Sequence, residues 1–279
     1  MTQPLARFVH ISDTHLLRPG QGLNYGDIPP EYTHFARQVL ALPYDSAAAL
    51  RALVAAVNAL PFKPDFTLHT GDVAAQVGVP QDYEAFQELL AGLPAPVIYT
   101  PGNHDDSAAL QRFLLGQTPA QPYDHAHTIN GVQLVCLDSS LTGAHAGRLS
   151  VAQVDWLKAQ LAPGDDRPLL VALHHHPLPL GADWLDSLIL DNGEALHIAL
   201  KRAGDRPRAV LYGHIHAHTH AVRDGVLYTS APSAWCEFRA WPGDAPPALL
   251  DGAAPGFNLV TVYPDRIAVL HHRLPLPFD

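Results

Sequence analysis

The sequence predicts an α/β fold in which strands and helices alternate along most of the chain. Short apolar runs that contain β-branched residues recur, and stretches with helical periodicity lie between them. Such alternation is typical of layered architectures in which helices cover the faces of a sheet. After Tyr212 the strand candidates follow one another closely, so we expect the sheet system to finish with antiparallel strands.

The expected elements follow from these two patterns. Strands are expected at 8–11, 65–68, 96–99, 132–137, 169–173 and 209–212, and then at 219–222, 226–229, 258–263 and 266–271. Helices are expected at 46–60, 81–90, 107–115 and 151–161, where apolar residues recur with helical spacing. Two proline-containing segments, 17–42 and 235–255, interrupt this rhythm. Loops this long are commonly functional, so we expect both beside the active site or a subunit interface.

Length and composition indicate an ordinary globular protein. The chain has 279 residues, of which 47% are hydrophobic and 16% charged. That length suits a single domain over residues 1–279 and is short for two domains. No run approaches the roughly 20 continuous apolar residues of a membrane helix, and the N-terminus lacks the pattern of a signal peptide. We therefore expect no membrane partner and a cytoplasmic location.

Cysteine and charge content narrow the class further. Cys136 and Cys236 are too few and too separated for a disulfide framework or a thiolate zinc site, which favours a reducing compartment and buried packing roles. The formal net charge is −10, and no stripe rich in lysine and arginine occurs. Proteins that bind long nucleic acid normally carry such a stripe, so we do not expect a nuclease that acts on long DNA.

Five polar blocks carry candidate metal ligands, and each block directly follows an apolar run. They are Asp13-Thr14-His15, Gly71-Asp72, Gly102-Asn103-His104-Asp105, His174-His175-His176 and Gly213-His214-Ile215-His216. A single block of this kind is more simply a turn, a helix cap or an exposed histidine. All five together favour a metal site, because open α/β sheets bind ligands at the carboxyl ends of strands and converging Asp, Asn and His side chains have few other uses.

The types of ligand indicate the chemistry. Imidazoles and carboxylates suit manganese, iron or zinc, and such sites leave coordination positions open to water, which favours catalysis. Seven candidate ligands exceed the needs of one four-coordinate ion, so we expect two ions that share a bridging carboxylate. Two ions about 3.5–4 Å apart can lower the pKa of a water molecule and hold a phosphoryl group during in-line displacement.

The order of these blocks resembles the calcineurin-like metallophosphoesterase superfamily from the first strand to the Gly213–His216 block. The longer strings at 10–16, 102–105, 174–179, 184–186 and 213–216 are similar to those of bacterial class III cyclic-nucleotide phosphodiesterases. The resemblance implies a layered α-β-β-α sandwich with two central mixed β-sheets flanked by helices. It also implies hydrolysis of a small phosphodiester, foremost 3',5'-cyclic AMP or another cyclic nucleotide, by a metal-activated water.

Other functions remain open beside this one. A broad phosphodiesterase or nucleotide pyrophosphatase of the same superfamily is the closest alternative, and a phosphoprotein phosphatase is disfavoured by the longer strings. A non-catalytic scaffold on the same fold is disfavoured because every block is intact. The expected partners are a small phosphodiester substrate and, in a homo-oligomer, further copies of the chain. The expected cofactors are two divalent metal ions, with Mn²⁺, Fe²⁺/Fe³⁺ or Zn²⁺ as candidates.

The resemblance implies a role for each ligand. It assigns one ion to Asp13, His15 and His216, the other ion to Asn103, His174 and His214, and the bridging position to Asp72. A carboxylate has two oxygens and can span two cations, whereas a neutral imidazole offers one lone pair. The neutral oxygen of Asn103 leaves the metals electrophilic.

Two further residues are implied as catalytic. His104 is expected beside the substrate, where an imidazolium would stabilise developing charge or protonate the leaving alkoxide. Asp105 is expected either to orient His104 or to cap the helix that begins at Ser107.

The remaining histidines are assigned less directly. His174 is preferred as the ligand because it directly follows a strand, which leaves His175 and His176 as supporting residues or substrate contacts. His218 and His220 alternate with His216 along an expected strand, and we interpret them as ordinary half-exposed histidines.

Overall fold

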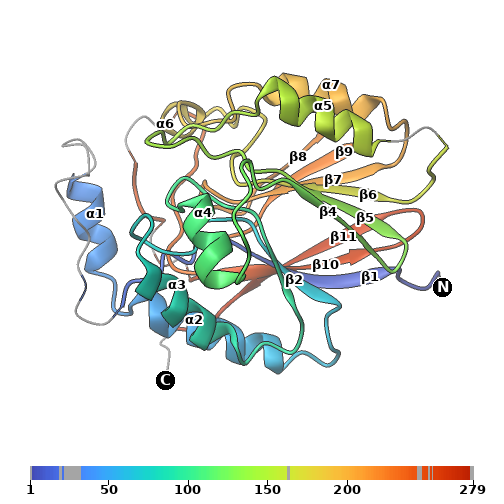
Figure 1. Cartoon of the computed structure of the whole chain (residues 1–279). Coiled ribbons are helices and arrows are strands. Elements are labelled where there is room, and N and C mark those ends of the chain that lie inside the picture. The colour runs from blue at the N-terminus through green and yellow to red at the C-terminus, as the bar shows by residue number, and fades with distance from the viewer. Residues whose placement is uncertain are drawn as a thin grey trace.

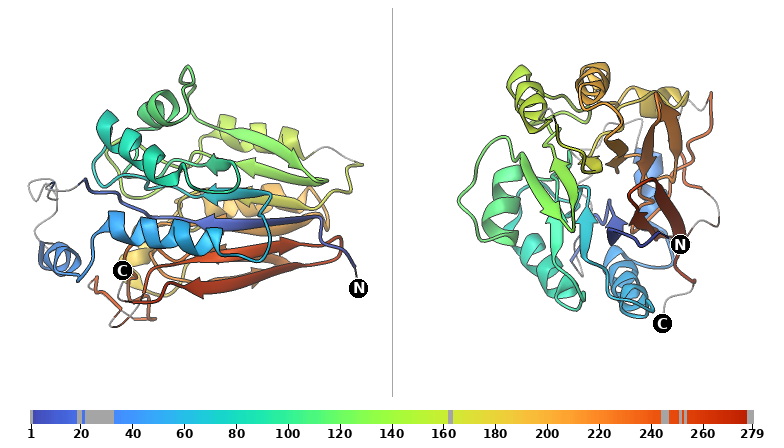
Figure 2. Two further views of the ribbon diagram at one scale, coloured as in Figure 1. Left: turned by 90° about the horizontal axis from the view of Figure 1, so that it is seen from below. Right: turned by 90° about the vertical axis from the view of Figure 1, so that its right-hand side faces the viewer.

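The computed structural model describes residues 2–18, 21, 33–161, 164–243, 247–250, 252 and 254–276. Two mixed β-sheets pack face to face, and helices cover their outer faces (Figure 1). Figure 2 shows the same arrangement from below and from the end, with the sheets between two helical layers. The predicted α-β-β-α sandwich is therefore confirmed.

The first sheet has the order β11-β10-β1-β2-β3. Its strands are β1 (Ala6–Ile11), β2 (Phe66–His69), β3 (Val97–Tyr99), β10 (Gly256–Val262) and β11 (Ile267–Arg273). β1, β2 and β3 run parallel, whereas β10 and β11 add antiparallel strands at one side. The expected antiparallel ending of the sheet system is thus confirmed.

The second sheet has the order β4-β5-β6-β7-β9-β8. Its strands are β4 (His125–Ile129), β5 (Val132–Cys136), β6 (Leu169–Ala172), β7 (Pro207–Tyr212), β8 (His220–Arg223) and β9 (Val226–Ser230). The four inner strands are parallel, and β4 and β8 pair antiparallel at the two edges. This is the mixed pattern of a doubly covered sheet.

Helices cover both outer faces. Beside the first sheet lie α2 (Ser46–Asn58), α3 (Pro80–Leu90), and α4 (Ser107–Ala109) with the π-helical turn Leu110–Leu114 that follows it, whereas α1 (Thr33–Leu40) lies at the end of the sandwich. Over the second sheet lie α5 (Val151–Gln160), α6 (Asp183–Asp186) and α7 (Gly193–Lys201). No helix in the described ranges has the length and apolar composition that a membrane span requires.

Alternation along β1 separates two cores. Phe8 faces the space between the sheets, where its ring stacks on Phe66 with a centroid distance of 4.4 Å. Val9 and Ile11 face the other way and pack against Leu53 of α2. Side chains that alternate in this way bury both faces of a strand, which explains why the sequence shows a continuous apolar run here.

The structure adds elements that the sequence prediction lacks. Residues 33–40, expected within a long loop, form α1, so that part of the loop prediction is wrong; residues 19–20 and 22–32 of the segment lie outside the described residues. β4 was not expected because it is a largely exposed edge strand without an apolar pattern. α7 does carry a helical signal, since Leu196, Ala199 and Leu200 share its buried face.

Candidate metal centre

The five polar blocks meet at the carboxyl ends of strands from both sheets. Asp13, Asp72 and Asn103 follow β1, β2 and β3 of the first sheet. His174 and His214 follow β6 and β7 of the second sheet. Parallel strands that end together bring these side chains to one edge of the sandwich, as the strand pattern predicts.

The backbone of most candidate ligands is left-handed. Five of the seven non-glycine residues with positive φ in the described structure are candidate ligands, and these five are Asp13 (53°), His15 (39°), Asp72 (57°), His214 (71°) and His216 (46°). Such a conformation is unfavourable for a residue with a Cβ and costs on the order of 1 kcal/mol or more. Its concentration here indicates that the fold sacrifices local stability to orient these side chains.

Two glycines make room for the carboxylates. A Cβ on Gly102 would overlap the carboxylate of Asp72, and a Cβ on Gly213 would lie 2.7 Å from the Asp13 carboxylate and closer still to Ser12 Oγ. Any larger residue would displace the side chains that define the site. These glycines are therefore required by close approach rather than by chain flexibility.

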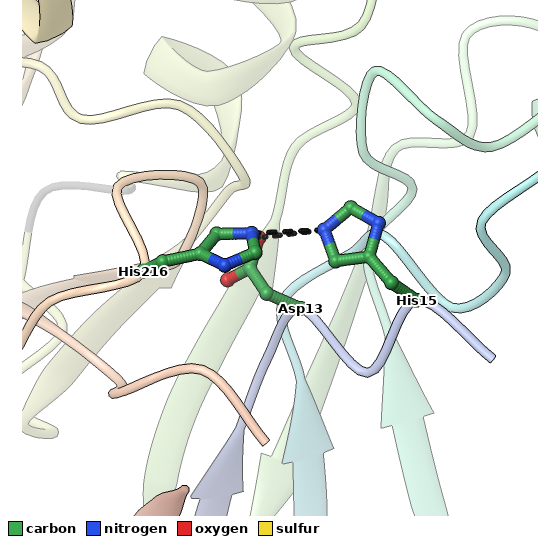
Figure 3. A group of neighbouring side chains, drawn as sticks. All are labelled: Asp13, His15 and His216. Atoms are coloured by element: carbon green, nitrogen blue, oxygen red, sulfur yellow. Dashed lines mark hydrogen bonds and ion pairs between the residues drawn. The ribbon is translucent and has the colours of Figure 1, made fainter. Parts of the chain in front are cut away.

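The first group of side chains consists of Asp13, His15 and His216 (Figure 3). The Nε2 atoms of His15 and His216 face each other at 2.9 Å. His216 Nε2 also lies 3.4 Å from Asp13 Oδ1, and His15 Nε2 lies 3.9 Å from the same oxygen. All three side chains are buried, so their polar atoms have little access to bulk water.

The second group is built around His174. Its Nε2 atom lies 3.3 Å from Asp72 Oδ2, 3.1 Å from Asn103 Oδ1 and 3.2 Å from His214 Nδ1. Asp72 Oδ2 is also 3.5 Å from His15 Nε2 in the first group. Asp72 is thus the carboxylate that contacts both groups.

Hydrogen bonds to the outer nitrogen of three histidine rings leave the other nitrogen of each ring facing the candidate ligand groups. Three backbone carbonyls accept from the outer ring nitrogens, in the pairs His216 Nδ1 with Cys236 O at 3.0 Å, His174 Nδ1 with Thr70 O at 2.6 Å, and His214 Nε2 with Leu188 O at 3.1 Å. A carbonyl only accepts, so the inner nitrogen of each neutral ring carries a lone pair. Lone pairs that face one another and a carboxylate repel unless a cation lies between them, and metal-binding histidines are oriented in this way. The donor set therefore fits metal ions.

The electrostatics of the site also favour positive charge. Burial is the largest influence on the pKa of His174 and lowers it, but Asp72, Asp13 and the hydrogen bond to Thr70 together raise the pKa to about 9. Burial likewise lowers the pKa of His216, and Asp13 and Cys236 together raise it to about 10. The inner nitrogen of each ring therefore binds a cation readily, either a proton or a metal ion. Asp72 itself has a pKa held well below its ordinary value, because His174, His104 and His15 outweigh the effect of burial. Within the described structure, the ion-pair partners of Asp13 and Asp72 are imidazoles.

His104 lies beside the first group. Its backbone N–H donates to Asp72 Oδ1 at 2.8 Å, and its ring packs edge-on against the ring of His15 at a centroid distance of 4.9 Å. The imidazole also lines the cavity above the site. Burial lowers the pKa of His104 below the value expected from sequence, which favours a neutral ring near pH 7.

Asp105 holds together the two loops that carry Asp72 and Asn103. Its carboxylate accepts hydrogen bonds from the backbone N–H groups of Asp72 at 2.8 Å, Gly102 at 3.0 Å and Val73 at 3.2 Å. The helix-cap hypothesis for Asp105 is wrong, because Asp106 caps α4 by accepting from the backbone N–H of Ala109. The Tyr83 hydroxyl also donates to Asp105 Oδ1 at 3.5 Å, so the hydrogen-bond partners of Asp105 are the backbone of the two ligand loops and Tyr83, and not the His104 ring.

The three consecutive histidines point in different directions. His174 reaches the ligand group, whereas His175 contacts Ser139 Oγ through Nδ1 at 2.8 Å and the backbone oxygen of His145 through Nε2 at 3.1 Å. His176 Nε2 lies 3.7 Å from Asp186. His218 stacks on a C-terminal histidine of β11 and belongs to none of the ligand groups found among the described residues.

A cavity of about 1200 Å³ opens above the candidate ligands. Both segments that interrupt the sequence pattern contribute to its walls, through Phe35 and Val39 on one side and Trp235 and Phe238 on the other. The sequence prediction missed the part of the wall formed by residues 138–148. A signal for it exists, because Asp138 follows the apolar run 132–137 just as the five blocks follow theirs.

Comparison with known proteins agrees with the fold and with the family that the sequence resembles. Residues 6–218 match the family described as calcineurin-like phosphoesterase. The chain therefore belongs to the calcineurin-like phosphoesterases, and the resemblance seen in the sequence is confirmed.

Curated relatives cover nearly the whole chain. A cAMP/cGMP dual specificity phosphodiesterase from Mycobacterium tuberculosis is 34% identical over 96% of this chain and 79% of the relative. A 3',5'-cyclic adenosine monophosphate phosphodiesterase from Escherichia coli is 30% identical over 98% of this chain and 94% of the relative. Among solved structures, a dimetal phosphatase from Danio rerio superposes with a TM-score of 0.67 over 99% of this chain and 100% of its own, at 16% identity, which supports the fold alone.

The position of Asp105 generates a prediction about stability. In Asp105→Ala, the backbone N–H groups of Asp72, Gly102 and Val73 would lose their acceptor, so we expect the free energy of unfolding to fall by about 1–3 kcal/mol. Urea denaturation at pH 6 measures this, because burial and Asp72 raise the pKa of Asp105 to about 7 and an ionised Asp105 above that pH itself lowers the stability of the wild type. Asp106→Asn is the matched control and should change little, since asparagine also caps helices. Equal losses in the two variants would contradict the role assigned to Asp105.

Proposed function

We propose that this chain is a binuclear metal-dependent phosphodiesterase that hydrolyses a small phosphodiester, foremost a 3',5'-cyclic nucleotide such as cyclic AMP. The observation that carries the proposal is the set of imidazole nitrogens that converge around the buried Asp72 carboxylate, at the floor of a cavity large enough for a nucleotide. The names of the bacterial relatives support the choice of substrate.

We further propose which residues hold the two ions. Asp13, His15 and His216 would bind one ion, since their ligand atoms form one compact group. Asn103, His174 and His214 would bind the other, and Asp72 would bridge the two because it contacts both groups. Neither His175 nor His176 is proposed as a ligand, because their rings contact other partners.

The ions would supply positive charge that lowers the pKa of the attacking water and stabilises the phosphoryl oxygens. The protein would supply orientation. The carbonyls of Thr70, Leu188 and Cys236 hold three imidazoles in one tautomer, so each ring presents its lone pair without a rearrangement. The Asp105 carboxylate fixes the loop that carries Asp72, which keeps the bridge in place during turnover.

His104 is proposed to act on the substrate rather than on the metals. Its ring lines the cavity next to His15, while its backbone N–H binds the bridging carboxylate. The neutral ring would donate an N–H hydrogen bond to a phosphoryl oxygen, whereas the imidazolium form would pass its extra proton to the leaving oxygen and become the neutral imidazole. Asp105 is proposed to support this step indirectly, through the loop that it shares with Asn103.

A second function of the same class is favoured by one observation. A glycerophosphodiester phosphodiesterase from Enterobacter lignolyticus is 32% identical over 74% of this chain and 69% of the relative. The same metal centre would serve a diester with an alkyl substituent, because the candidate ligands would act on the phosphoryl group that all these diesters share. Broad action on nucleotide pyrophosphates belongs to the same alternative.

The setting of the enzyme is proposed from the core and the cysteines. One inter-sheet core joins both sheets, which supports a single domain across the chain. Cys136 and Cys236 are buried and unpaired, which supports a reducing compartment such as the cytoplasm.

An activity panel tests the proposal. Purified protein loaded with manganese, iron or zinc is assayed with cyclic AMP, cyclic GMP, glycerophosphoethanolamine, a nucleotide pyrophosphate and a phosphorylated peptide. We expect the highest kcat/KM for a cyclic nucleotide and loss of all hydrolysis on chelation of the metal. Hydrolysis that resists chelation would refute the metal mechanism. A higher kcat/KM for glycerophosphoethanolamine than for the cyclic nucleotides would show that a glycerophosphodiester is the preferred substrate.

The bridging role of Asp72 predicts the metal content of variants. Elemental analysis should find about two ions per wild-type chain, because two groups of ligands share one carboxylate. Asp72→Ala should lose both ions, and His216→Ala should lose one. His218→Ala is the matched control, since that ring stacks on β11 outside the ligand groups. Two ions retained in Asp72→Ala would show that the bridge is misassigned.

His104 separates catalysis from metal binding. His104→Ala should keep both ions and lose rate by a factor of about 10²–10⁴ if the ring protonates the leaving oxygen. The loss should then be smaller for an activated aryl ester, which leaves without a proton, than for a ribose ester. Equal losses for both esters would indicate charge stabilisation at the phosphoryl oxygens instead. Loss of metal would identify His104 as a ligand.

A further inference from the structure

The wall of the cavity on the His216 side is aromatic. The Phe238 ring stacks on the His216 ring with a centroid distance of 3.9 Å and an interplanar angle of 7°. The ring of Phe35 in α1 also contacts the Phe238 ring, in an edge-to-face arrangement with a centroid distance of 4.8 Å and an interplanar angle of 75°. A row of rings therefore leads from a candidate metal ligand to α1, although the residues come from three distant parts of the sequence.

The same wall is apolar beyond the rings. Val39 and Ala36 of α1 line it next to Phe35, and Trp235 completes it where its ring lies 6.4 Å from that of His15. Phe35 is half-buried, whereas Trp235 is almost fully covered. Phe238 is half-buried as well, but one of its faces is covered by the His216 ring, so Phe35 is the ring of this row that lies farthest from the metal centre with surface left for a ligand.

Charge is scarce on the cavity surface outside the metal centre. Of the described residues that line the cavity, Arg148 is the one lysine or arginine, and its guanidinium lies 3.7 Å from Asp191. Asp138, another lining residue, already accepts from Ser107 and Ser140. The protein therefore offers little to neutralise a second phosphate, whereas the aromatic wall suits an uncharged planar group.

We infer that the aromatic wall selects phosphodiesters with a planar aromatic substituent and that this substituent packs against Phe35. The inference rests on the proposed function, because the phosphoryl group must lie over the candidate metal ligands. The centroid distances are 3.9 Å from His216 to Phe238 and 4.8 Å from Phe238 to Phe35. A nucleoside is long enough to reach from a phosphoryl group beside His216 to Phe35. Phe35 is then a specificity-determining residue that the catalytic centre does not need, and a nucleobase is the substituent that fits.

Binding of a slowly hydrolysed substrate analogue tests this role without relying on turnover. A phosphorothioate analogue of cyclic AMP is titrated calorimetrically into the metal-loaded protein. Base–aromatic stacking is strong enough that Phe35→Ala should raise the dissociation constant about tenfold. Phe35→Trp should restore affinity, since it keeps a stacking surface. Leu141→Ala, an apolar change on another wall of the same cavity, is the matched control and should leave the constant within about twofold.

Steady-state kinetics provide the second readout. In Phe35→Ala, KM for cyclic AMP should rise about tenfold with kcat nearly unchanged, while KM for glycerophosphoethanolamine stays the same because that diester has no aromatic group. An equal rise for both diesters, or an effect of Leu141→Ala larger than that of Phe35→Ala, would overturn the inference.

Failure of the proposed function would look different. If the wild-type protein hydrolyses no cyclic nucleotide, the proposed substrate is wrong. The role of the aromatic wall can then still be tested with bis(4-nitrophenyl) phosphate, whose substituents are aromatic. A selective rise of KM for this ester in Phe35→Ala supports the aromatic wall even then, and an unchanged KM overturns it. Circular dichroism of Phe35→Trp and Phe35→Ala confirms that α1 remains helical in both comparisons.

Discussion

The buried carboxylate of Asp72 is the constraint on which the rest of the site depends. It lies within 3.5 Å of imidazole nitrogens in both ligand groups and is 2% exposed. An ionised group in such a place is stable only with positive charge and hydrogen bonds around it. The left-handed backbone of Asp72, the missing side chain at Gly102 and the three N–H groups held by Asp105 all serve to keep this carboxylate in position.

The apolar cores of the sandwich offset the loss of stability that this arrangement causes. Strained ligand loops and buried carboxylates both lower the free energy of unfolding. Two extensive apolar cores, one between the sheets and one under α5 and α7, offset that cost through burial of apolar surface. Because the ligand loops leave rigid parallel strands, small shifts of one loop are resisted by the sheets on both sides.

The candidate metal ligands and the walls of the cavity lie on different parts of the molecule. The candidate metal ligands lie at strand ends, where the backbone is fixed by the sheets. The cavity walls come from α1, from residues 138–148 and from the segment that begins at Trp235, none of which belongs to a central strand. Phe238 links the two parts, because it stacks on His216 and contacts Phe35. Substrate preference can therefore change through the walls while the metal centre stays the same.

The sequence by itself determined the order of the central strands along the chain, the five blocks of candidate ligands and the family, because strand periodicity and the residues that follow a strand are local patterns. The tertiary structure decided which way each ring points. It directed His174 toward His214 and His175 toward Ser139. It also placed the Asp105 carboxylate where it accepts from the backbone of the ligand loops, and it brought Phe35 beside Phe238. These outcomes depend on contacts between segments far apart in sequence, and the direction of a side chain is set by that packing rather than by its neighbours in the chain.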